Sequence, residues 1–238
     1  MLRKMLCCLL ALLALTPCTQ AEENAMTFDP NQPKIALTFD DGPGEFTQEM
    51  LDILAENGVR ATFFVVGTHM EVWPELVTAV HDAGHEVGLH TWKHENLNEQ
   101  TDYYVLYNLM DCQEWVERLT GEQAKWLRPP YGITGGSTYF ATRKLGLRIV
   151  TWSVDSEDWL SQDPQKIYDR IMKGAKDGAV ILCHDTYEPT LEAMRRVLPA
   201  LKEQGYQFLT VSELFSLYEG ELKSNAVYYC LDPAKAKK

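Results

Sequence analysis

Short apolar runs rich in β-branched and aromatic residues alternate with longer amphipathic stretches from Lys34 onward. This alternation is typical of parallel strands that are joined by helical crossovers. Strands are predicted over residues 35–39, 61–66, 85–89, 126–127, 148–154, 179–183 and 208–211. Helices are predicted over residues 45–57, 71–83, 101–119, 137–145, 164–176 and 189–204, where apolar residues recur at helical spacing.

Glycines mark the ends of the predicted helices, as expected for residues that follow a last helical turn. They are Gly58, Gly84, Gly121, Gly146, Gly178 and Gly205. Because the alternation continues without a break in composition, we expect one α/β domain, either a closed barrel or an open doubly wound sheet. Polar clusters directly follow the predicted strands, which is where barrel enzymes build their sites, and this position favours the barrel.

The first residues have the pattern of a secretory signal peptide. Arg3 and Lys4 precede an apolar run over residues 5–15, and small and polar residues follow up to Ala21. The run is shorter than the roughly 20 residues that a membrane-spanning helix needs. We therefore expect cleavage after Ala21 and a secreted protein, with an uncleaved membrane anchor or lipidation at Cys18 as the alternatives.

The balance of charges limits the partners of this chain. Its 238 residues include 22 Lys and Arg and 34 Asp and Glu, a formal net charge of −12. Loss of the predicted signal peptide would leave 20 basic and 34 acidic residues, a net charge of −14. This acidity argues against a nucleic-acid partner, which requires a basic surface. Three cysteines would remain, Cys112, Cys183 and Cys230, and with this odd number we expect no obligatory disulfide.

Two adjacent carboxylates, Asp40 and Asp41, end the first predicted strand ahead of Gly42 and Pro43. Like charges at this spacing raise the pKa of one carboxyl group unless a cation intervenes. A turn or a helix cap would also place acidic residues here. The pair is therefore a candidate for metal binding or catalysis that needs support from other clusters.

A pair of histidines supplies that support. His90 and His94 are four residues apart, and one helical turn would bring both imidazoles to the same face. Two histidines and one carboxylate leave a coordination position open for water, as in catalytic zinc sites. Thr91 stands where zinc proteases with paired histidines carry a glutamate base, so the base must come from elsewhere, and Asp40 is the natural candidate. The histidines without matching partners are expected to be surface or core residues: His69, His81 and His85.

Three further polar segments follow later predicted strands. In Arg128-Pro129-Pro130-Tyr131-Gly132, the two prolines fix the backbone, so that the arginine and the tyrosine emerge at set positions. Residues 152–159 read Trp-Ser-Val-Asp-Ser-Glu-Asp-Trp, and residues 181–185 read Ile-Leu-Cys-His-Asp. A third histidine, His184, therefore arrives near the same rim, with a capping or core role as its alternative.

These five segments, in this order, resemble the five motifs of the polysaccharide deacetylase family, also called the NodB-homology or carbohydrate esterase family 4 domain. The resemblance implies a single-domain α/β fold, a distorted (β/α)7 barrel. It implies a divalent metal, zinc with cobalt or nickel as alternatives, held by Asp41, His90 and His94. It divides the chain into a signal peptide (1–21), an N-terminal linker (22–33), the catalytic domain (34–217) and a C-terminal tail (218–238).

The same resemblance implies a role for each remaining site residue. Asp40 would be the general base, held ionised by Arg128, and His184 the acid that protonates the leaving amine. Asp158 would raise the pKa of His184, and the backbone N–H of Tyr131 would stabilise an oxyanion. Four supporting residues are also implied: Arg60 to steady Asp158, and Trp159, Leu182 and Pro130 to line the pocket for the acetyl group.

The implied function is hydrolysis of N-acetyl groups on amino sugars of peptidoglycan or chitin-type oligomers, which gives acetate and a free amine. Removal of O-acetyl groups from xylan is an alternative within the same family. A non-catalytic carbohydrate-binding relative is the alternative from another class. We expect a monomer whose partner is an acetylated polysaccharide or oligosaccharide, and no nucleic-acid partner.

Overall fold

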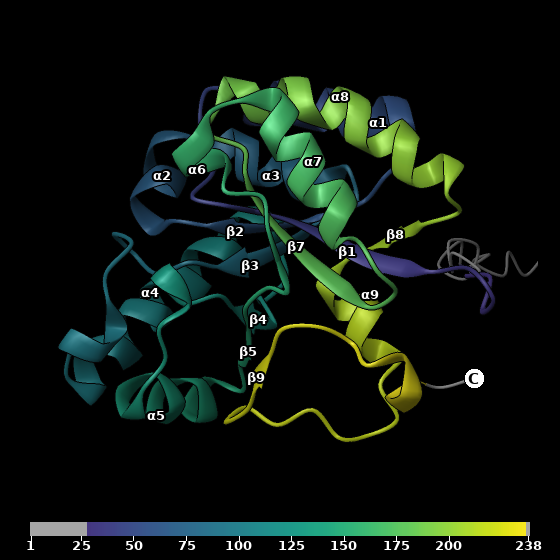
Figure 1. Ribbon diagram of the computed structural model, residues 1–238. Coiled ribbons are helices and arrows are strands. Elements are labelled where there is room, and N and C mark those ends of the chain that lie inside the picture. Colours follow the sequence, from purple (N-terminus) through teal and green to yellow (C-terminus); the bar gives the residue numbers. More distant parts are fainter. Residues whose placement is uncertain (1–27, 237–238) are drawn as a thin grey trace, which may run out of the picture.

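The computed structural model describes residues 28–236, which fold around one nine-stranded sheet with helices packed outside it (Figure 1). The strands are β1 (Lys34–Asp40), β2 (Thr62–Val65), β3 (Glu86–Leu89), β4 (Trp126–Leu127), β5 (Arg148–Val150), β6 (Val154–Asp155), β7 (Ala179–His184), β8 (Gln207–Leu209) and β9 (Val227–Tyr228). The predicted signal peptide lies outside the described residues. No helix within residues 28–236 has the length and apolar character needed to span a bilayer.

The sheet is a parallel, incomplete barrel, which confirms the predicted α/β class. Its strand order is β6-β7-β1-β2-β3-β4-β5-β9, and β8 pairs with β1 beside this path. Strand β6 is at one end of this order and β5 is next to last at the other, although only residues 151–153 separate them in the sequence. Residues 151–153 connect the two sides of the barrel opening: the Thr151 N–H bonds to the Tyr228 carbonyl, and the Ser153 N–H bonds to the Val180 carbonyl. The predicted strand over 148–154 is therefore two strands with different partners.

Helices surround this sheet. They are α1 (Thr47–Asn57), α2 (Gly67–Val72), α3 (Pro74–Asp82), α4 (Asp102–Thr120), α5 (Gly136–Leu145), α6 (Asp158–Ser161), α7 (Pro164–Gly174), α8 (Glu188–Glu203) and α9 (Val211–Ser216), with short 3₁₀ turns η1 (Leu97–Glu99), η2 (Pro130–Gly132) and η3 (Pro233–Lys235). Helix α8 packs against α1 and α7, and α4 packs against α3 and α5, as Figure 1 shows. All six glycines predicted to end helices have positive φ.

Alternation along β1 separates two cores. Ile35, Leu37 and Phe39 belong to the apolar cluster between the sheet and its helices. Ala36 belongs to a second cluster with Phe215 of α9, inside the curved sheet. Because side chains of a strand alternate between its faces, Thr38 and Asp40 share the inner face with Ala36. The strand therefore delivers one carboxylate into the barrel, at the carboxyl end of β1.

Two expectations about local structure were wrong. The helix predicted over 71–83 is two helices, because Pro74 starts α3 where a continued helix would need a backbone N–H. The strand predicted over 208–211 ends at Leu209, because the Thr210 hydroxyl accepts from the Glu213 N–H and the Glu213 carboxylate accepts from the Thr210 N–H, which caps α9.

The predicted C-terminal tail is part of the fold. Val227–Tyr228 forms β9 on the edge of β5, and Leu231 is buried in the inner core. The Leu231 N–H bonds to the Gly178 carbonyl at 2.8 Å. A strand of two residues is too short to show an alternating pattern, so it could not be predicted from the sequence. The cysteines among residues 28–236 are unpaired in this structure: Cys112, Cys183 and Cys230.

Candidate active site

Polar side chains meet where the parallel strands end. Asp40 ends β1, His184 ends β7, and the two residues are paired in register. His90 directly follows β3, and Arg128 directly follows β4. Since carboxyl ends of parallel strands share one edge of the sheet, these four side chains reach one another from distant parts of the chain.

The candidate metal ligands lie together. Ligand atoms of Asp41, His90 and His94 all lie within 4.8 Å of one another. Asp41 Oδ1 is 3.3 Å from His90 Nε2 and 3.4 Å from His94 Nε2. Among the described residues, Asp41 Oδ1 is buried without a hydrogen-bond partner. One unsatisfied carboxylate oxygen beside two imidazole nitrogens fits a divalent cation.

A turn, not a helix, brings the two histidines together, so the helical expectation for this pair was wrong. Residues 90–96 form no helix, and both Thr91 (φ 64°) and His94 (φ 58°) adopt the left-handed conformation. Asp41 has the same kind of backbone (φ 70°). This conformation is uncommon for residues other than glycine, and it occurs here at two of the three candidate ligands.

Hydrogen bonds behind the ligands fix their orientation. His90 Nδ1 donates to the Arg128 carbonyl at 2.6 Å, which leaves Nε2 unprotonated and directed at Asp41. His69 Nδ1, on α2, donates to the Asp41 carbonyl at 2.7 Å. His69, expected to be a surface or core residue, is half-buried and supports the backbone of Asp41 through this bond. Nothing in the sequence near His69 signals this contact, because α2 follows a different strand.

Electrostatics keep the candidate ligands in their metal-binding forms. Burial alone would raise the pKa of Asp41, but the histidines around it, His90 first and then His184 and His94, outweigh burial and lower the pKa to about 2. Burial, followed by the charge of His90, lowers the pKa of His94. An ionised carboxylate beside neutral imidazole is the state that binds a divalent metal.

Asp40 faces a buried arginine. Arg128 Nη1 donates to Asp40 Oδ1 at 2.7 Å and to Thr38 Oγ1 at 2.6 Å, and Nη2 donates to the Thr151 carbonyl at 2.9 Å. The guanidinium also stacks 4.2 Å from the Phe64 ring. Asp40 and Arg128 are both buried, and a buried guanidinium without a carboxylate partner would strongly destabilise the fold. Arg128 thus positions Asp40, whose Oδ2 lies 3.7 Å from His90 Nε2.

His184 is held by Asp158. Asp158 Oδ1 lies 2.7 Å from His184 Nδ1, and Asp158 Oδ2 accepts from the His184 N–H and the Thr190 hydroxyl. Burial alone would lower the pKa of His184, but the hydrogen bond and charge of Asp158, with the charges of Asp40 and Asp41, raise it to about 9. His184 Nε2 lies 3.9 Å from Asp41 Oδ2, so a cationic imidazolium stands beside the candidate metal ligands.

The expectation that Arg60 steadies Asp158 was wrong. Arg60 lies just before β2, at the amino ends of the strands, and its guanidinium forms a close ion pair with Glu213 of α9. Asp158 stands at the opposite end of the strands, where backbone and hydroxyl groups donate to it: the N–H groups of Trp159 and His184 and the Thr190 hydroxyl. These donors satisfy the carboxylate without an arginine.

A buried carboxylate next to His184 was not predicted. Asp185 is fully buried, accepts from the Thr47 hydroxyl, and packs so closely on Gly42 that a Cβ there would approach Asp185 Oδ1 to 2.5 Å. Burial raises the pKa of Asp185 to about 6, against the hydrogen bond from Thr47. Gly42 thereby lets the loop that carries Asp41 pack against the end of β7.

The remaining predicted residues border the cluster. Tyr131 in η2 has φ 61° and lies with its exposed ring edge-on to His94, at 4.7 Å between ring centroids. Pro130 and Leu182 are buried, and Trp159 is half exposed next to Asp158. Their roles as pocket walls, and that of the Tyr131 N–H, stay predictions.

Comparisons with known proteins agree with the fold. The sequence model of the polysaccharide deacetylase family matches residues 27–150. Peptidoglycan-N-acetylmuramic acid deacetylase PdaC of Bacillus subtilis is 39% identical over 189 residues, which cover 79% of this chain and 40% of PdaC. A peptidoglycan-N-acetylglucosamine deacetylase of Bacillus cereus is 36% identical over 192 residues, which cover 78% of this chain and 90% of the relative.

A solved structure extends this likeness to three dimensions. A family 4 acetyl xylan esterase from Clostridium thermocellum, in complex with a cobalt ion, matches with a TM-score of 0.77 at 29% identity, over 83% of this chain and 98% of that one. The present chain spans less than half the length of PdaC but nearly all of these two smaller relatives. By sequence and by fold, the chain belongs to the polysaccharide deacetylase family, carbohydrate esterase family 4.

Proposed function

We propose that this chain is a secreted, metal-dependent deacetylase that removes N-acetyl groups from amino sugars of peptidoglycan or chitin-type polymers. One observation carries the proposal: a three-ligand cluster, Asp41, His90 and His94, lies within 4 Å of a further carboxylate, 3.7 Å away, and of a cationic imidazole, 3.9 Å away. Two relatives are named as deacetylases of N-acetylated peptidoglycan sugars, which supports this substrate class. Secretion rests on the predicted signal peptide over residues 1–21.

The reaction adds water to the acetamide carbonyl carbon and breaks the C–N bond. Asp41, His90 and His94 would hold a divalent metal, which would supply Lewis-acid chemistry for the carbonyl and for water. Asp40, which is paired with Arg128, removes a proton from the attacking water. The Tyr131 N–H stabilises the negative charge that develops on the carbonyl oxygen.

Collapse to products needs a proton donor beside the cluster. His184, cationic beside Asp158, gives its Nε2 proton to the leaving nitrogen, so that the C–N bond breaks to give acetate and a free amine. Asp40 Oδ2 lies 3.7 Å from His90 Nε2, and His184 Nε2 lies 3.9 Å from Asp41 Oδ2. Two different residues next to the ligand cluster can therefore serve as base and as acid.

A pH profile tests the assignment of His184. Because its pKa is raised above the usual value, the acid form persists into the alkaline range, and activity should fall as pH rises through the folded-state pKa. Asp158→Asn removes the charge that raises this pKa, so we expect the alkaline limb of kcat/KM to move to lower pH by about one to two pH units. Asp163→Asn, at an exposed cap of α7, is the control and should leave the limb in place. An unmoved limb in Asp158→Asn would assign the acid to another group.

Removal of O-acetyl groups from xylan is the second candidate, since the structural relative with cobalt is named as an acetyl xylan esterase. The same base, ligands and acid serve both reactions. Acetate release from N-acetylglucosamine oligomers, peptidoglycan and acetylated xylan separates the two candidates. We expect release from the N-acetylated substrates; release from xylan alone would reverse the choice. No release from any of them by zinc-loaded protein would leave a non-catalytic carbohydrate-binding protein.

A further inference from the structure

The solvent face of α4 changes character along its length. Its first turns expose three tyrosines: Tyr103 (65% exposed), Tyr104 (44%) and Tyr107 (59%). Beyond Met110, the exposed residues of the same helix include Asp111, Glu114, Glu117 and Arg118. Large exposed aromatic clusters are uncommon on soluble proteins and mark sites of interaction. We call Tyr103, Tyr104 and Tyr107 the tyrosine surface.

The tyrosine surface is continuous with the candidate active site. The Tyr104 hydroxyl donates to Glu95 Oε1 at 3.0 Å, and Glu95 directly follows the candidate ligand His94. Asn108, one turn further along α4, donates to the same Glu95 oxygen and accepts from the Trp92 N–H. The amino end of α4 is therefore bonded to the turn that carries both candidate histidine ligands.

A second set of contacts connects the tyrosine surface with the Tyr131 side of the site. The Ser137 hydroxyl, at the start of α5, donates to Asp102 Oδ1 at 2.7 Å. Tyr103 packs edge-on against Phe140 of α5, with ring centroids 5.9 Å apart. Figure 1 shows α4 and α5 side by side below the sheet, in agreement with their contacts. The exposed tyrosines of α4 are thus supported from below by a half-buried aromatic ring of α5.

We propose that the tyrosine surface binds sugar rings of the substrate polymer beyond the unit that is deacetylated. This inference rests on the proposed function. The faces of a pyranose ring carry C–H groups that stack on aromatic rings, while its hydroxyls need polar neighbours. Tyrosine offers both, on a rigid side chain that loses little conformational entropy on binding. A neutral glycan also avoids the repulsion that an acidic partner would meet on a chain with a net charge of −12.

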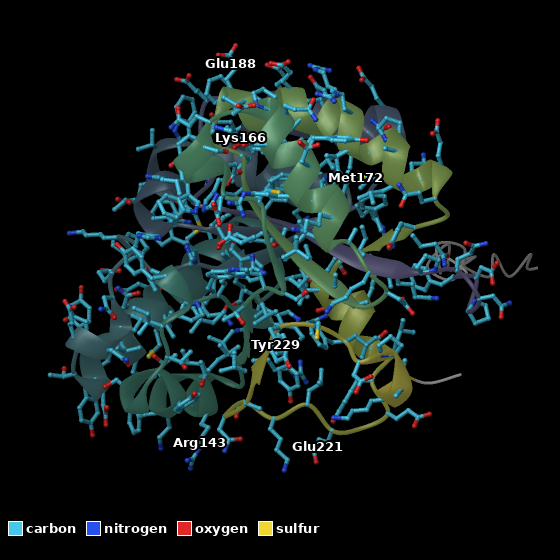
Figure 2. All side chains as sticks on the ribbon, in the orientation of Figure 1. Arg143, Lys166, Met172, Glu188, Glu221 and Tyr229 are labelled. Atoms are coloured by element: carbon cyan, nitrogen blue, oxygen red, sulfur yellow. The ribbon has the colours of Figure 1, made fainter. Side chains whose placement is uncertain are left out.

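The test compares a long substrate with a short one. In Tyr103→Ser/Tyr107→Ser, we expect the ratio of kcat/KM on insoluble acetylated chitin to that on a soluble N-acetylglucosamine tetramer to fall by on the order of tenfold. Tyr104 is left in place because it holds Glu95. The matched control is Tyr229→Ser: Tyr229 is 57% exposed and lies on the C-terminal segment, away from α4 in Figure 2. Its ratio should equal that of the unaltered protein.

The outcomes separate this inference from the proposed function. An unchanged ratio in the double variant overturns the tyrosine surface while the deacetylase stands. No acetate from either substrate with the unaltered protein overturns the proposed function instead. A dimer of the unaltered protein that becomes monomeric in the double variant would make the surface a contact between copies of this chain, and this too overturns the inference. If the double variant unfolds because Tyr103 no longer packs against Phe140, Tyr107→Ser is tested alone. Its substrate ratio and its oligomeric state are then judged in the same way.

Discussion

Replacing Asp40 with asparagine should lower kcat/KM for acetate release by about a thousandfold, while the protein still binds metal. Asparagine has nearly the shape of aspartate but cannot accept a proton from water. The three candidate ligands are unchanged in this variant, since Asp40 Oδ2 is only a neighbour of His90 Nε2, at 3.7 Å. The measurements are acetate release and bound zinc, on the same preparation.

The variant also leaves the charge of Arg128 without its partner in the interior. Breaking a buried pair in this way costs about 3–5 kcal/mol of stability, so the melting temperature should fall. Thr38→Val is the matched control, because it removes another contact of the same guanidinium and keeps the carboxylate. It should lose stability but keep most activity. If the Asp40→Asn protein is folded and comes back without metal, the roles of Asp40 and Asp41 are reversed.

His94→Ala should have the second large effect, a loss of zinc affinity of more than about a hundredfold, because even residues that only orient a ligand contribute ten- to a hundredfold. His94 supplies one of the three ligand atoms and is partly exposed, so its removal opens the cluster without a cavity in the core. A competition titration against a zinc-binding dye measures the affinity. Acetate release should be lost in parallel at limiting zinc.

His81→Ala is the control for this second prediction. His81 is a partly exposed histidine on α3, next to Asp82 and remote from the strand ends that form the site. Its zinc affinity should match that of the unaltered protein. Wild-type affinity in His94→Ala would remove this residue from the ligand set and leave the metal to other side chains.

Most of the fold and the candidate residues could be predicted from the sequence. Parallel strands carry long apolar runs, and polar residues after such runs collect at one edge of the sheet, so Asp40, His90, Arg128 and His184 could be placed together without coordinates. The pairing of His184 with Asp158 also agreed with its expectation. The alternation of apolar runs and polar residues therefore predicts which residues lie at the ends of the strands.

Contacts between elements that are distant in sequence could not be predicted. His69 reaches Asp41 from α2, and Arg60 points to α9 at the other end of the strands, because helix packing sets both positions. The turn between His90 and His94 depends on two residues in the left-handed conformation, which the spacing of four residues does not distinguish from a helix. Strand β9 was missed because two residues are too few for a periodic signal.

Acetate release from N-acetylglucosamine oligomers, followed through removal and return of metal, tests the central claim most directly. We expect the unaltered protein to lose activity when a chelator removes its metal and to regain it with stoichiometric zinc, because Asp41, His90 and His94 then have their cation again. Protein shown by elemental analysis to contain no metal, yet releasing acetate at the original rate, would contradict the account.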